Sequence, residues 1–550
     1  MTALLELKNL GVTYRTGGGD VPAVRGVGLS LDAGGTLGVA GESGSGKSTV
    51  AMSVLRLLPR SAKITGEILL DGEDVNDMRW GRLRAVRWAE ASVVFQGAMH
   101  ALNPVRRVGE QIAEPIRLHA PDGKAPSEAQ VQARVTELLE QVDLPRSRAG
   151  AYPHELSGGQ KQRVMIAMAL ACEPRLVIAD EPTTALDVVV QAQVLSVLSK
   201  LVAERGIGLI MISHDLSVLA ATCERIAVMY DGELVEERPS AELMSSPRHE
   251  HSKALAAAFP TVGDPVSRYA PATATPLPPE PEERTGTGES PLLAAENLHV
   301  AFRDRKGKRI HAVNGVNLEV RRDEIVALVG QSGSGKTTLA RTLLGLQKAD
   351  SGAVRYAGKP MPSSGAGLRA YRREVQLVLQ DPTSALNPAH TVYEAVAEGP
   401  RIHGLRGERD VVLKALESAE LRPPEKYLDR LPHELSGGQR QRVVIAGALA
   451  LEPSLLLADE PVASLDASVR GEILALLLRL RRQLGLSALV ITHDLGLAWN
   501  IADRVAVMYR GELVETGTVE QVLLDPQHEY TKSLLAALPG GTAQRTAADR

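Results

Sequence analysis

Gly41-Glu42-Ser43-Gly44-Ser45-Gly46-Lys47-Ser48 specifies how this chain of 550 residues begins to fold, and the chain holds a second version, Gly330-Gln331-Ser332-Gly333-Ser334-Gly335-Lys336-Thr337. Each follows an apolar, strand-like run and precedes a run with helical character. In that context G-x-x-x-x-G-K-[ST] curls its backbone N–H groups around phosphates. The lysine reaches the β- and γ-phosphates, and the Ser or Thr hydroxyl ligates Mg²⁺. A chance glycine-rich turn becomes improbable because both copies have matching surroundings.

These loops predict a set of phosphate-binding residues in each copy. The set comprises Gly41, Ser43, Gly44, Gly46, Lys47, Ser48 and Thr49, with Gly330, Ser332, Gly333, Gly335, Lys336, Thr337 and Thr338.

The chain is an internal duplication. The Leu-Ser-Gly-Gly-Gln stretch, an Asp-Glu-Pro and a His-Asp each recur 279 positions later. The glycine loops are 289 positions apart and the glutamines at 96 and 380 are 284 apart, so loops differ in length while the core spacing is kept. A constant offset of this kind predicts one domain present twice, and the chain length also favours at least two domains.

Acidic pairs end two of the apolar runs. Asp180 and Glu181 follow residues 176–179, and Asp459 and Glu460 follow residues 455–458. Short apolar runs bounded by prolines predict central parallel strands that deliver these carboxylates beside the glycine loops. We expect each Asp to help hold Mg²⁺ and each Glu to act as general base toward water. The alternative, an acidic pair that only caps the next helix, does not explain why both acids recur.

A histidine also ends a strand-like run in each copy. His214 and His493 each follow their glutamate by 33 residues. A lone histidine at a strand end is usually an ordinary surface or core residue, but this repeated spacing favours a contact with the γ-phosphate.

The Leu-Ser-Gly-Gly-Gln stretches, residues 156–160 and 435–439, lead into apolar, helix-like runs. The N-terminal end of a helix attracts phosphate, although such a pentapeptide alone could be an ordinary helix start. Residues 5–7 and 12–14 predict two strand segments. Tyr14 and Phe302 precede their glycine loops by 27 and 28 residues, and purine stacking and simple strand packing are equally compatible with that spacing.

Bulk composition excludes several classes of protein. The net charge of −4, from 62 basic and 66 acidic residues, gives no reason to expect nucleic acid as a partner. The two cysteines form no cluster, so disulfide frameworks and cysteine-ligated metal sites are not expected. The sequence shows neither a secretory signal nor an apolar stretch of membrane-spanning length. We therefore expect a cytoplasmic protein that meets a membrane only through partners.

Taken together, these motifs resemble those of the ATP-binding cassette (ABC) ATPases over nearly the whole chain. The resemblance implies an α/β fold with two tandem P-loop NTPase domains, each having a mixed sheet, an antiparallel β subdomain and a helical subdomain. It implies an intrachain pseudo-dimer in which each ATP lies between the glycine loop of one cassette and the Leu-Ser-Gly-Gly-Gln turn of the other.

The resemblance also carries residue roles. Glu181, Glu460, His214, His493, Gln96 and Gln380 are implied to be catalytic. Mg²⁺ is implied to be held by Ser48, Gln96, Asp180, Thr337, Gln380 and Asp459. Nucleotide contacts are implied for Ser157, Gly158, Gly159 and Gln160 and for Ser436, Gly437, Gly438 and Gln439. Tyr14 and Phe302 are added as nucleotide-contact candidates on their spacing.

Within this family the chain is similar to ATPase subunits of oligopeptide and dipeptide importers. The similarity rests on Ala-Leu-Asn-Pro at 101–104 and 385–388 and on terminal segments at 246–255 and 525–534. It implies two membrane permease subunits, an extracytoplasmic solute-binding protein, and a peripheral location at the cytoplasmic face of the membrane. An exporter ATPase and a soluble, ribosome-associated tandem cassette are the alternatives. Some relatives hold an iron–sulfur cluster after the terminal segment, and none is predicted here because no cysteine follows.

The domain boundaries follow from composition and from the repeat. Residues 1–260 and 292–539 form the two cassettes, each with its terminal extension, and residues 540–550 form a flexible tail. Residues 261–291 are rich in Pro, Thr, Ala and Glu and lack periodicity, which predicts an extended, solvated linker. The stretches 97–155 and 381–434 are predicted to be mainly helical. Gly97-Ala98 after Gln96, where Gln380 has Asp381-Pro382, is the main departure from the family pattern.

Overall fold

The computed structural model describes residues 3–95, 97, 101–119, 126–184, 186–279, 290–303, 307, 309–463 and 465–538. The chain divides into two compact units: the first comprises Met1–Ala256 and Ala537–Arg550, and the second runs from Ala257 to Ala536. Each unit contains a six-stranded mixed sheet and a four-stranded antiparallel sheet. This architecture confirms the predicted α/β class with two tandem cassettes.

The six-stranded sheet of the first unit has the order β10-β9-β3-β8-β7-β6. Strands β9, β3, β8, β7 and β6 run parallel, and β10 pairs antiparallel with β9. Its strands β7 and β8 are wholly buried, as expected of central parallel strands. The bounds are β3 (Thr36–Ala40), β6 (Ala91–Val94), β7 (Leu176–Asp180), β8 (Gly208–Ile212), β9 (Arg225–Tyr230) and β10 (Glu233–Pro239).

The four-stranded antiparallel sheet of the first unit has the order β2-β1-β4-β5. Its strands are β1 (Leu5–Thr16), β2 (Gly19–Leu31), β4 (Ala62–Leu70) and β5 (Glu73–Asp74). The prediction of two short strands at residues 5–7 and 12–14 is therefore wrong, because both segments belong to the single strand β1. A register shift between Leu7 and Leu10 spans Asn9, whose φ is 51°, and this irregularity lets the strand pass through the polar stretch between the two apolar ones.

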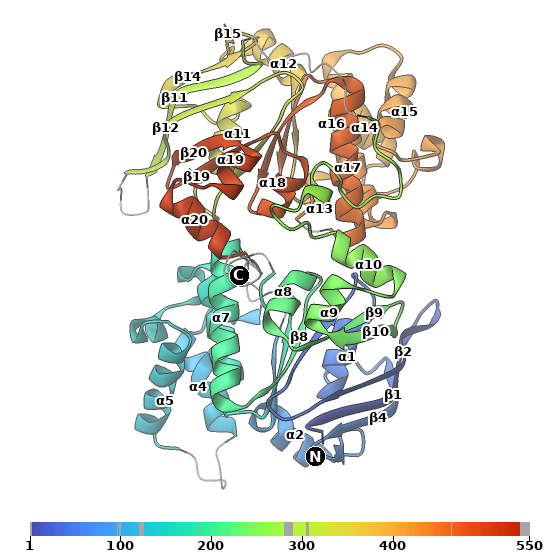
Figure 1. Ribbon diagram of the computed structural model, residues 1–550, viewed down its shortest axis with the longest axis vertical. Coiled ribbons are helices and arrows are strands. Elements are labelled where there is room, and N and C mark those ends of the chain that lie inside the picture. Colours follow the sequence, from blue (N-terminus) through green and yellow to red (C-terminus); the bar gives the residue numbers. More distant parts are fainter. Residues whose placement is uncertain are drawn as a thin grey trace, which may run out of the picture. The chain divides into compact units, whose positions relative to one another are not determined.

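Helices cover the sheets and build a separate helical part. In Figure 1, α4 and α5 lie on the side of the first unit away from β1 and β4. The apolar stripe of α5 is buried, because α5 packs against α4 and α6. The helices are α1 (Lys47–Val54), α2 (Trp80–Ala89), α4 (Val108–Leu118), α5 (Glu128–Gln141), α6 (Gly158–Ala169), α7 (Val188–Arg205), α8 (Leu216–Thr222), α9 (Ser240–Ser245) and α10 (Glu250–Ala257).

The second unit repeats this plan. Its sheets have the orders β16-β17-β18-β13-β19-β20 and β12-β11-β14-β15. The strands are β11 (Leu293–Arg303), β12 (Arg309–Val320), β13 (Ile325–Val329), β14 (Ser351–Tyr356), β15 (Lys359–Pro360), β16 (Val375–Val378), β17 (Leu455–Asp459), β18 (Ser487–Thr492), β19 (Arg504–Tyr509) and β20 (Glu512–Thr518). The helices are α11 (Lys336–Leu343), α12 (Gly365–Glu374), α13 (Pro382–Ala385), α14 (Val392–His403), α15 (Glu408–Ser418), α16 (Gly437–Leu449), α17 (Ala467–Leu484), α18 (Leu495–Ile501), α19 (Val519–Leu524) and α20 (Glu529–Ala536).

The described part of the predicted linker packs on the second unit. The indole Nε1–H of Trp499 donates to the carbonyl of Asp264 at 2.9 Å, and the hydroxyl of Tyr269 donates to Asp503 at 2.7 Å. Helix α17 comes so close that a Cβ on Gly471 would lie 2.0 Å from the carbonyl oxygen of Ala272. The solvated conformation expected for residues 261–279 is therefore wrong. Composition does not predict this packing, because the polar backbone groups of the segment are hydrogen-bonded by side chains of helices that are distant in the sequence.

Candidate nucleotide-binding sites

The three sequence features predicted to act together lie at one edge of each mixed sheet. In the first unit β8 lies between β3 and β7, and all three run parallel. The glycine loop follows β3, Asp180 ends β7, and His214 comes two residues after β8. In open parallel sheets, ligands bind at the carboxyl ends of the strands. The second unit arranges β13, β17 and β18 in the same way.

Both glycine loops require glycine for steric reasons. Gly41 has φ 149°, and a Cβ there would meet the carbonyl oxygen of Met229 at 2.3 Å. Gly46 has φ 100°, and its Cβ would lie 2.6 Å from the carbonyl oxygen of Ala23. Gly335 repeats this with a contact of 2.0 Å to the carbonyl oxygen of Ala312. The backbone therefore holds the tight turn that an N–H cradle for phosphate needs.

The lysine of each loop is buried against the loop's own carbonyl groups. Lys47 is 6 % exposed, and its ammonium donates to the carbonyl oxygens of Gly41 at 2.8 Å and Glu42 at 2.6 Å. Lys336 donates to the carbonyl oxygens of Gly330 at 2.6 Å and Gln331 at 2.9 Å. These bonds hold each ammonium inside the turn where phosphate oxygens are expected.

The predicted Mg²⁺ ligands of the first copy meet across the sheet edge. The hydroxyl of Ser48 donates to a carboxylate oxygen of Asp180 at 3.2 Å, and Asp180 is 2 % exposed. Burial raises the pKa of Asp180, so a cation beside it would relieve an unfavourable charge. Oxygens around octahedral Mg²⁺ lie roughly 3 Å apart, so this pair fits the ion. Burial likewise raises the pKa of Asp459, and the side chain of Thr337 partly offsets that rise.

Each glutamate is held by its histidine. Nδ1 of His214 lies 3.2 Å from Oε1 of Glu181, and the hydroxyl of Thr184 donates to Oε2 at 2.7 Å. Burial opposes ionisation, but the hydrogen bonds and charges of His214, with Thr184 and Lys47, lower the pKa of Glu181 to about 2. The carboxylate is therefore ionised and accepts only, so Nδ1 carries the proton. Glu181 also has φ 45°, which is uncommon for a residue other than glycine.

The second copy has the same arrangement. Nδ1 of His493 lies 2.9 Å from Oε1 of Glu460, and the side-chain amide of Gln380 donates to Oε2 at 2.9 Å. The structure thus brings together three of the residues predicted to be catalytic. Burial again opposes ionisation, yet the contacts with His493 lower the pKa of Glu460. Gln96, the counterpart predicted in the first copy, lies outside the described residues.

The Leu-Ser-Gly-Gly-Gln turns begin helices, as expected. Ser157 caps α6 by accepting the N–H of Gln160 at 3.3 Å, while the Gln160 side chain accepts the N–H of Ser157 at 3.2 Å. Ser436 and Gln439 repeat this capping box. A Cβ on Gly159 would meet Val190 at 2.1 Å, and one on Gly438 would meet Val469 at 2.3 Å. The second glycine of each turn therefore allows close packing on α7 or α17, a reason that the sequence did not reveal.

The two predicted adenine-stacking aromatics differ in exposure. The hydroxyl of Tyr14 lies 3.2 Å from that of Thr49 on α1, and its ring packs against the core. Phe302 near the end of β11 is 45 % exposed. Purine stacking and simple strand packing are each compatible with these two positions.

Comparison with known proteins identifies the family. The family model described as "ABC transporter" matches residues 24–184 and 313–463, which contain both glycine loops and both Asp-Glu pairs. The chain belongs to the ABC transporter family. As an ABC cassette protein it binds and hydrolyses ATP, and the predicted resemblance to this family is confirmed. "Oligopeptide/dipeptide transporter, C-terminal region" matches residues 514–549.

Relatives match this ABC protein over nearly its full length. Glutathione import ATP-binding protein GsiA of Escherichia coli (strain K12) is 41% identical, with 98% of this chain and 89% of the relative aligned. The protein of the same name from Salmonella typhimurium is 42% identical over the same shares. Among solved structures, cbiO1 from Clostridium perfringens, part of the ABC transporter complex cbiONQ, is 30% identical, with 47% of this chain and 98% of cbiO1 aligned and a TM-score of 0.40.

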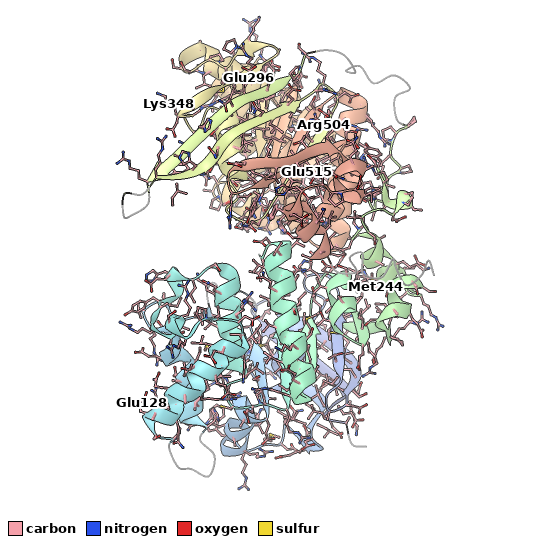
Figure 2. The ribbon with its side chains drawn as sticks, turned by 60° about the vertical axis from the view of Figure 1, so that its left-hand side comes forward. Glu128, Met244, Glu296, Lys348, Arg504 and Glu515 are labelled. Carbon is pink, nitrogen blue, oxygen red and sulfur yellow. The ribbon has the colours of Figure 1, made fainter. Side chains whose placement is uncertain are left out.

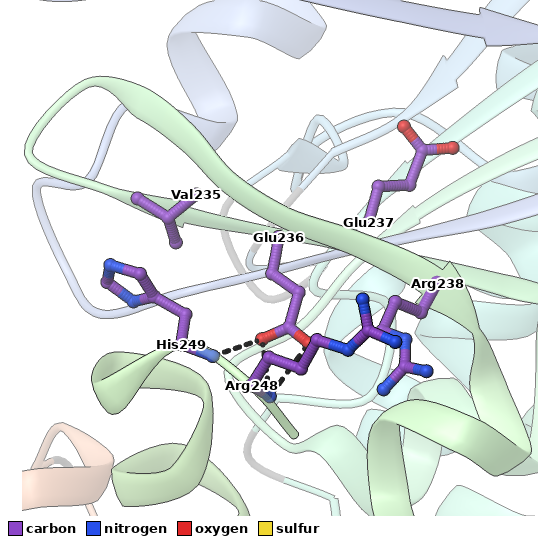
Figure 3. Close-up of a pocket in the computed structure, with 6 residues that line it drawn as sticks. All are labelled: Val235, Glu236, Glu237, Arg238, Arg248 and His249. Carbon is purple, nitrogen blue, oxygen red and sulfur yellow. Dashed lines mark hydrogen bonds between the residues drawn. The ribbon is translucent and has the colours of Figure 1, made fainter. Parts of the chain in front are cut away.

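The extension of each cassette is fastened to the edge strand of its sheet. Figure 3 shows the carboxylate of Glu236 on β10 accepting the backbone N–H groups of Arg248 and His249, both at 2.9 Å. A pocket of about 530 Å³ opens beside these residues. On β20, Glu515 accepts the N–H groups of Gln527 at 2.8 Å and His528 at 3.1 Å. The sequence pointed to the terminal segments but not to these two glutamates, because 12 residues separate each from its first partner.

The described residues contain neither a membrane-spanning helix nor a cluster of metal-binding side chains. None of the helices in the described ranges is long and apolar enough to cross a membrane. Within the same ranges, no group of three or more His, Cys, Asp or Glu side chains is arranged to hold a metal ion. The candidate Mg²⁺ positions instead combine one hydroxyl with one carboxylate, to which nucleotide phosphates and water would add oxygens.

Proposed function

We propose that this chain is the double-cassette ATPase of an importer for short peptides or glutathione. The observation that carries the proposal is the fastened extension present in both copies, together with the similarity to the glutathione import proteins. The partners would be two membrane permease subunits and an extracytoplasmic solute-binding protein, with the chain at the cytoplasmic face of the membrane.

Each ATP would lie between the glycine loop of one cassette and the Ser-Gly-Gly turn of the other. In the first site Lys47 would leave the loop carbonyls to bind the β- and γ-phosphates, and the start of α16 at Ser436 would face the γ-phosphate. Ser48 and Asp180 would hold Mg²⁺, which would neutralise phosphate charge. The second site would use Lys336, Thr337 and Asp459 with the turn at Ser157.

Hydrolysis would follow from the carboxylate–histidine pair. Glu181 accepts a proton as the water oxygen bonds to the γ-phosphorus, while the bond from that phosphorus to the β,γ-bridging oxygen breaks. His214 keeps the carboxylate oriented through Nδ1–H and, as the imidazolium, would donate its Nε2–H to the γ-phosphate. Glu460, His493 and Gln380 would do the same in the second site. ATP-bound and ADP-bound states would favour different arrangements of the permeases, because only differential affinity drives such a change.

Uptake by intact cells tests the proposal. Cells that depend on this chain should take up labelled glutathione or a labelled dipeptide, and a Glu181→Gln, Glu460→Gln double variant should lose uptake by at least tenfold. The tagged chain, extracted from membranes with detergent, should retain two polytopic membrane proteins. Loss of efflux instead of uptake, or copurification of ribosomes, would overturn the importer assignment.

A further inference from the structure

The extension of the second cassette reaches its glycine loop. Tyr530 lies on α20, and its hydroxyl accepts the backbone N–H of Gln331 at 2.9 Å. Gln331 is the second residue of the loop, directly after Gly330, whose φ is 158°. Tyr530 is only 8 % exposed, so this hydrogen bond is shielded from water. A segment that the sequence identifies only as typical of importers thus contacts the phosphate-binding turn.

One ring contact and two backbone hydrogen bonds at the start of α20 position Tyr530. It stacks on Tyr509 at the end of β19, with ring centroids 4.1 Å apart and planes at 24°. Its backbone N–H donates to Nδ1 of His528 at 3.1 Å. Glu515, labelled in Figure 2, accepts the N–H of His528 and so ties the start of α20 to β20. The phenol is therefore held by the sheet and is not a freely rotating surface group.

The first copy has the same frame without the phenol. Glu236 fastens the start of α10 as Glu515 fastens α20, and His251 occupies the place of Tyr530, 279 positions earlier. The His251 ring packs on Tyr230 with centroids 4.4 Å apart. Burial lowers the pKa of His251, which favours the neutral imidazole. Only the second copy therefore has a hydroxyl at this place against the start of its loop.

We propose that Tyr530 is a positioning residue for nucleotide binding, and that the importer-type extension forms part of the second ATP site. A loop with three glycines at positive φ, Gly330, Gly333 and Gly335, has many accessible conformations when unrestrained. The hydrogen bond to Gln331 fixes where the turn begins, so less conformational freedom is lost when phosphate binds. This step rests on the proposed ATP-binding role of the loop. It gives the second site a loop restraint that the first site lacks.

Tyr530→Phe in the full chain tests the proposal, because it keeps the ring and its stacking and removes only the hydroxyl. Photolabelling with increasing 8-azido-ATP, followed by mass spectrometry of the labelled peptides, gives a half-saturation concentration for each cassette. We expect that value to rise about threefold to tenfold for the second cassette, as loss of one hydrogen bond implies, and to stay constant for the first. The KM for ATP should rise at unchanged kcat, which a general loss of folded protein would not produce.

Tyr393→Phe is the matched control, since it removes a hydroxyl that donates to Glu408 at 2.8 Å within the helical part of the same unit. It should leave both half-saturation values unchanged. Tyr530→His, which inserts the residue of the first copy, provides a second variant and should match Tyr530→Phe. Unchanged labelling of the second cassette in both Tyr530 variants would overturn the inference. Absence of ATP-competed labelling in the wild type would instead overturn the proposed function.

Discussion

Helices α7 and α17 hold the same place in the two cassettes but have different surroundings. Arg479 on α17 is 6 % exposed and donates to the carbonyl of Thr275 in the linker at 3.1 Å. Lys200, its counterpart on α7, has a side chain that is 70% exposed. Gly471 likewise corresponds to Ala192, 279 positions earlier. The duplicated helix has therefore diverged where a neighbouring segment of the chain covers one copy.

The buried arginine side chains of α17 can lie under the linker because each is paired with a carboxylate. Arg481 is 2 % exposed and binds both carboxylate oxygens of Asp503 at 2.9 Å, and Tyr269 of the linker donates to the same carboxylate. A buried ion pair of this kind needs every partner, since removing one leaves an uncompensated charge. The catalytic edge, by contrast, is nearly the same in both copies. The two cassettes thus differ in whether a linker packs on this helix, and they resemble each other in the residues expected to hydrolyse ATP.

The largest expected effect tests whether the chemistry is equivalent. Glu181→Gln and Glu460→Gln should each lower kcat by on the order of 10²-fold, because a general base contributes roughly 10² to 10⁴. The two losses should be similar, since each glutamate is held by one histidine at 3.2 and 2.9 Å. Steady-state phosphate release from the purified chain measures both.

Glu204→Gln, on the exposed end of α7, is the control for that comparison and should retain wild-type turnover. Near-normal hydrolysis in the double glutamate variant would refute the general-base roles. A large loss of kcat in one single variant and none in the other would show that the two sites differ in catalysis, and that the cassettes differ in more than the linker packed on α17.

The sequence allowed the sheet edge to be predicted because the relevant residues sit beside buried strands. Asp180 and Asp459 end apolar runs, and strand ends that follow such runs converge at one edge of a parallel sheet. The linker contact at Gly471 and the bond from Gln331 to Tyr530 could not be predicted. Each joins segments 199 residues apart, and composition gives no information on such approaches. Glycine at 159 and 438 was interpreted as a phosphate contact, whereas the structure adds a packing requirement against Val190 and Val469.

A smaller effect is expected when the linker contact is disturbed. Gly471→Ala places a Cβ 2.0 Å from the carbonyl oxygen of Ala272, so the linker must move, at a cost of about 1–3 kcal/mol. Alanine's better helix propensity offsets at most about 1 kcal/mol of that. Hydrogen exchange of peptides covering residues 266–278 and 470–484 should become faster, and the unfolding temperature of the second unit should fall.

Gly447→Ala on α16 is the matched change for the linker variant, because a Cβ there lies 3.9 Å from its nearest neighbour, the carbonyl oxygen of Ala395. It should stabilise the same unit by up to about 1 kcal/mol through helix propensity alone. If Gly471→Ala stabilised the unit equally, the linker would not pack on α17 in solution, and the contrast between the two helices would need another cause.

The smallest expected effect concerns a feature that the two copies share. Burial opposes ionisation of Glu236, but the nearby Ser252 side chain, the backbone N–H groups of His249 and Arg248, and the charge of Arg238 lower its pKa below the ordinary 4.5. Contacts with Gln527, Thr531 and His528 lower the pKa of Glu515 in the same way, again against burial. Since each folded-state pKa is below the unfolded one, the stabilisation is complete above about pH 4.5 and is lost as the pH falls through the folded-state value.

Acidification from pH 6 toward pH 3 should therefore loosen α10 and α20 together, by about 1 kcal/mol each. Hydrogen exchange of both helices, corrected for the intrinsic dependence of exchange on pH, measures this loosening. Glu236→Gln should remove the pH dependence for α10 and leave it for α20, whereas Glu233→Gln, at the exposed start of β10, should change neither helix. If α10 loosened with acid as much in Glu236→Gln as in the wild type, another group would hold the first extension. The two fastenings would then not be equivalent, and the copies would differ in how their extensions are held as well as at the covered helix and at Tyr530.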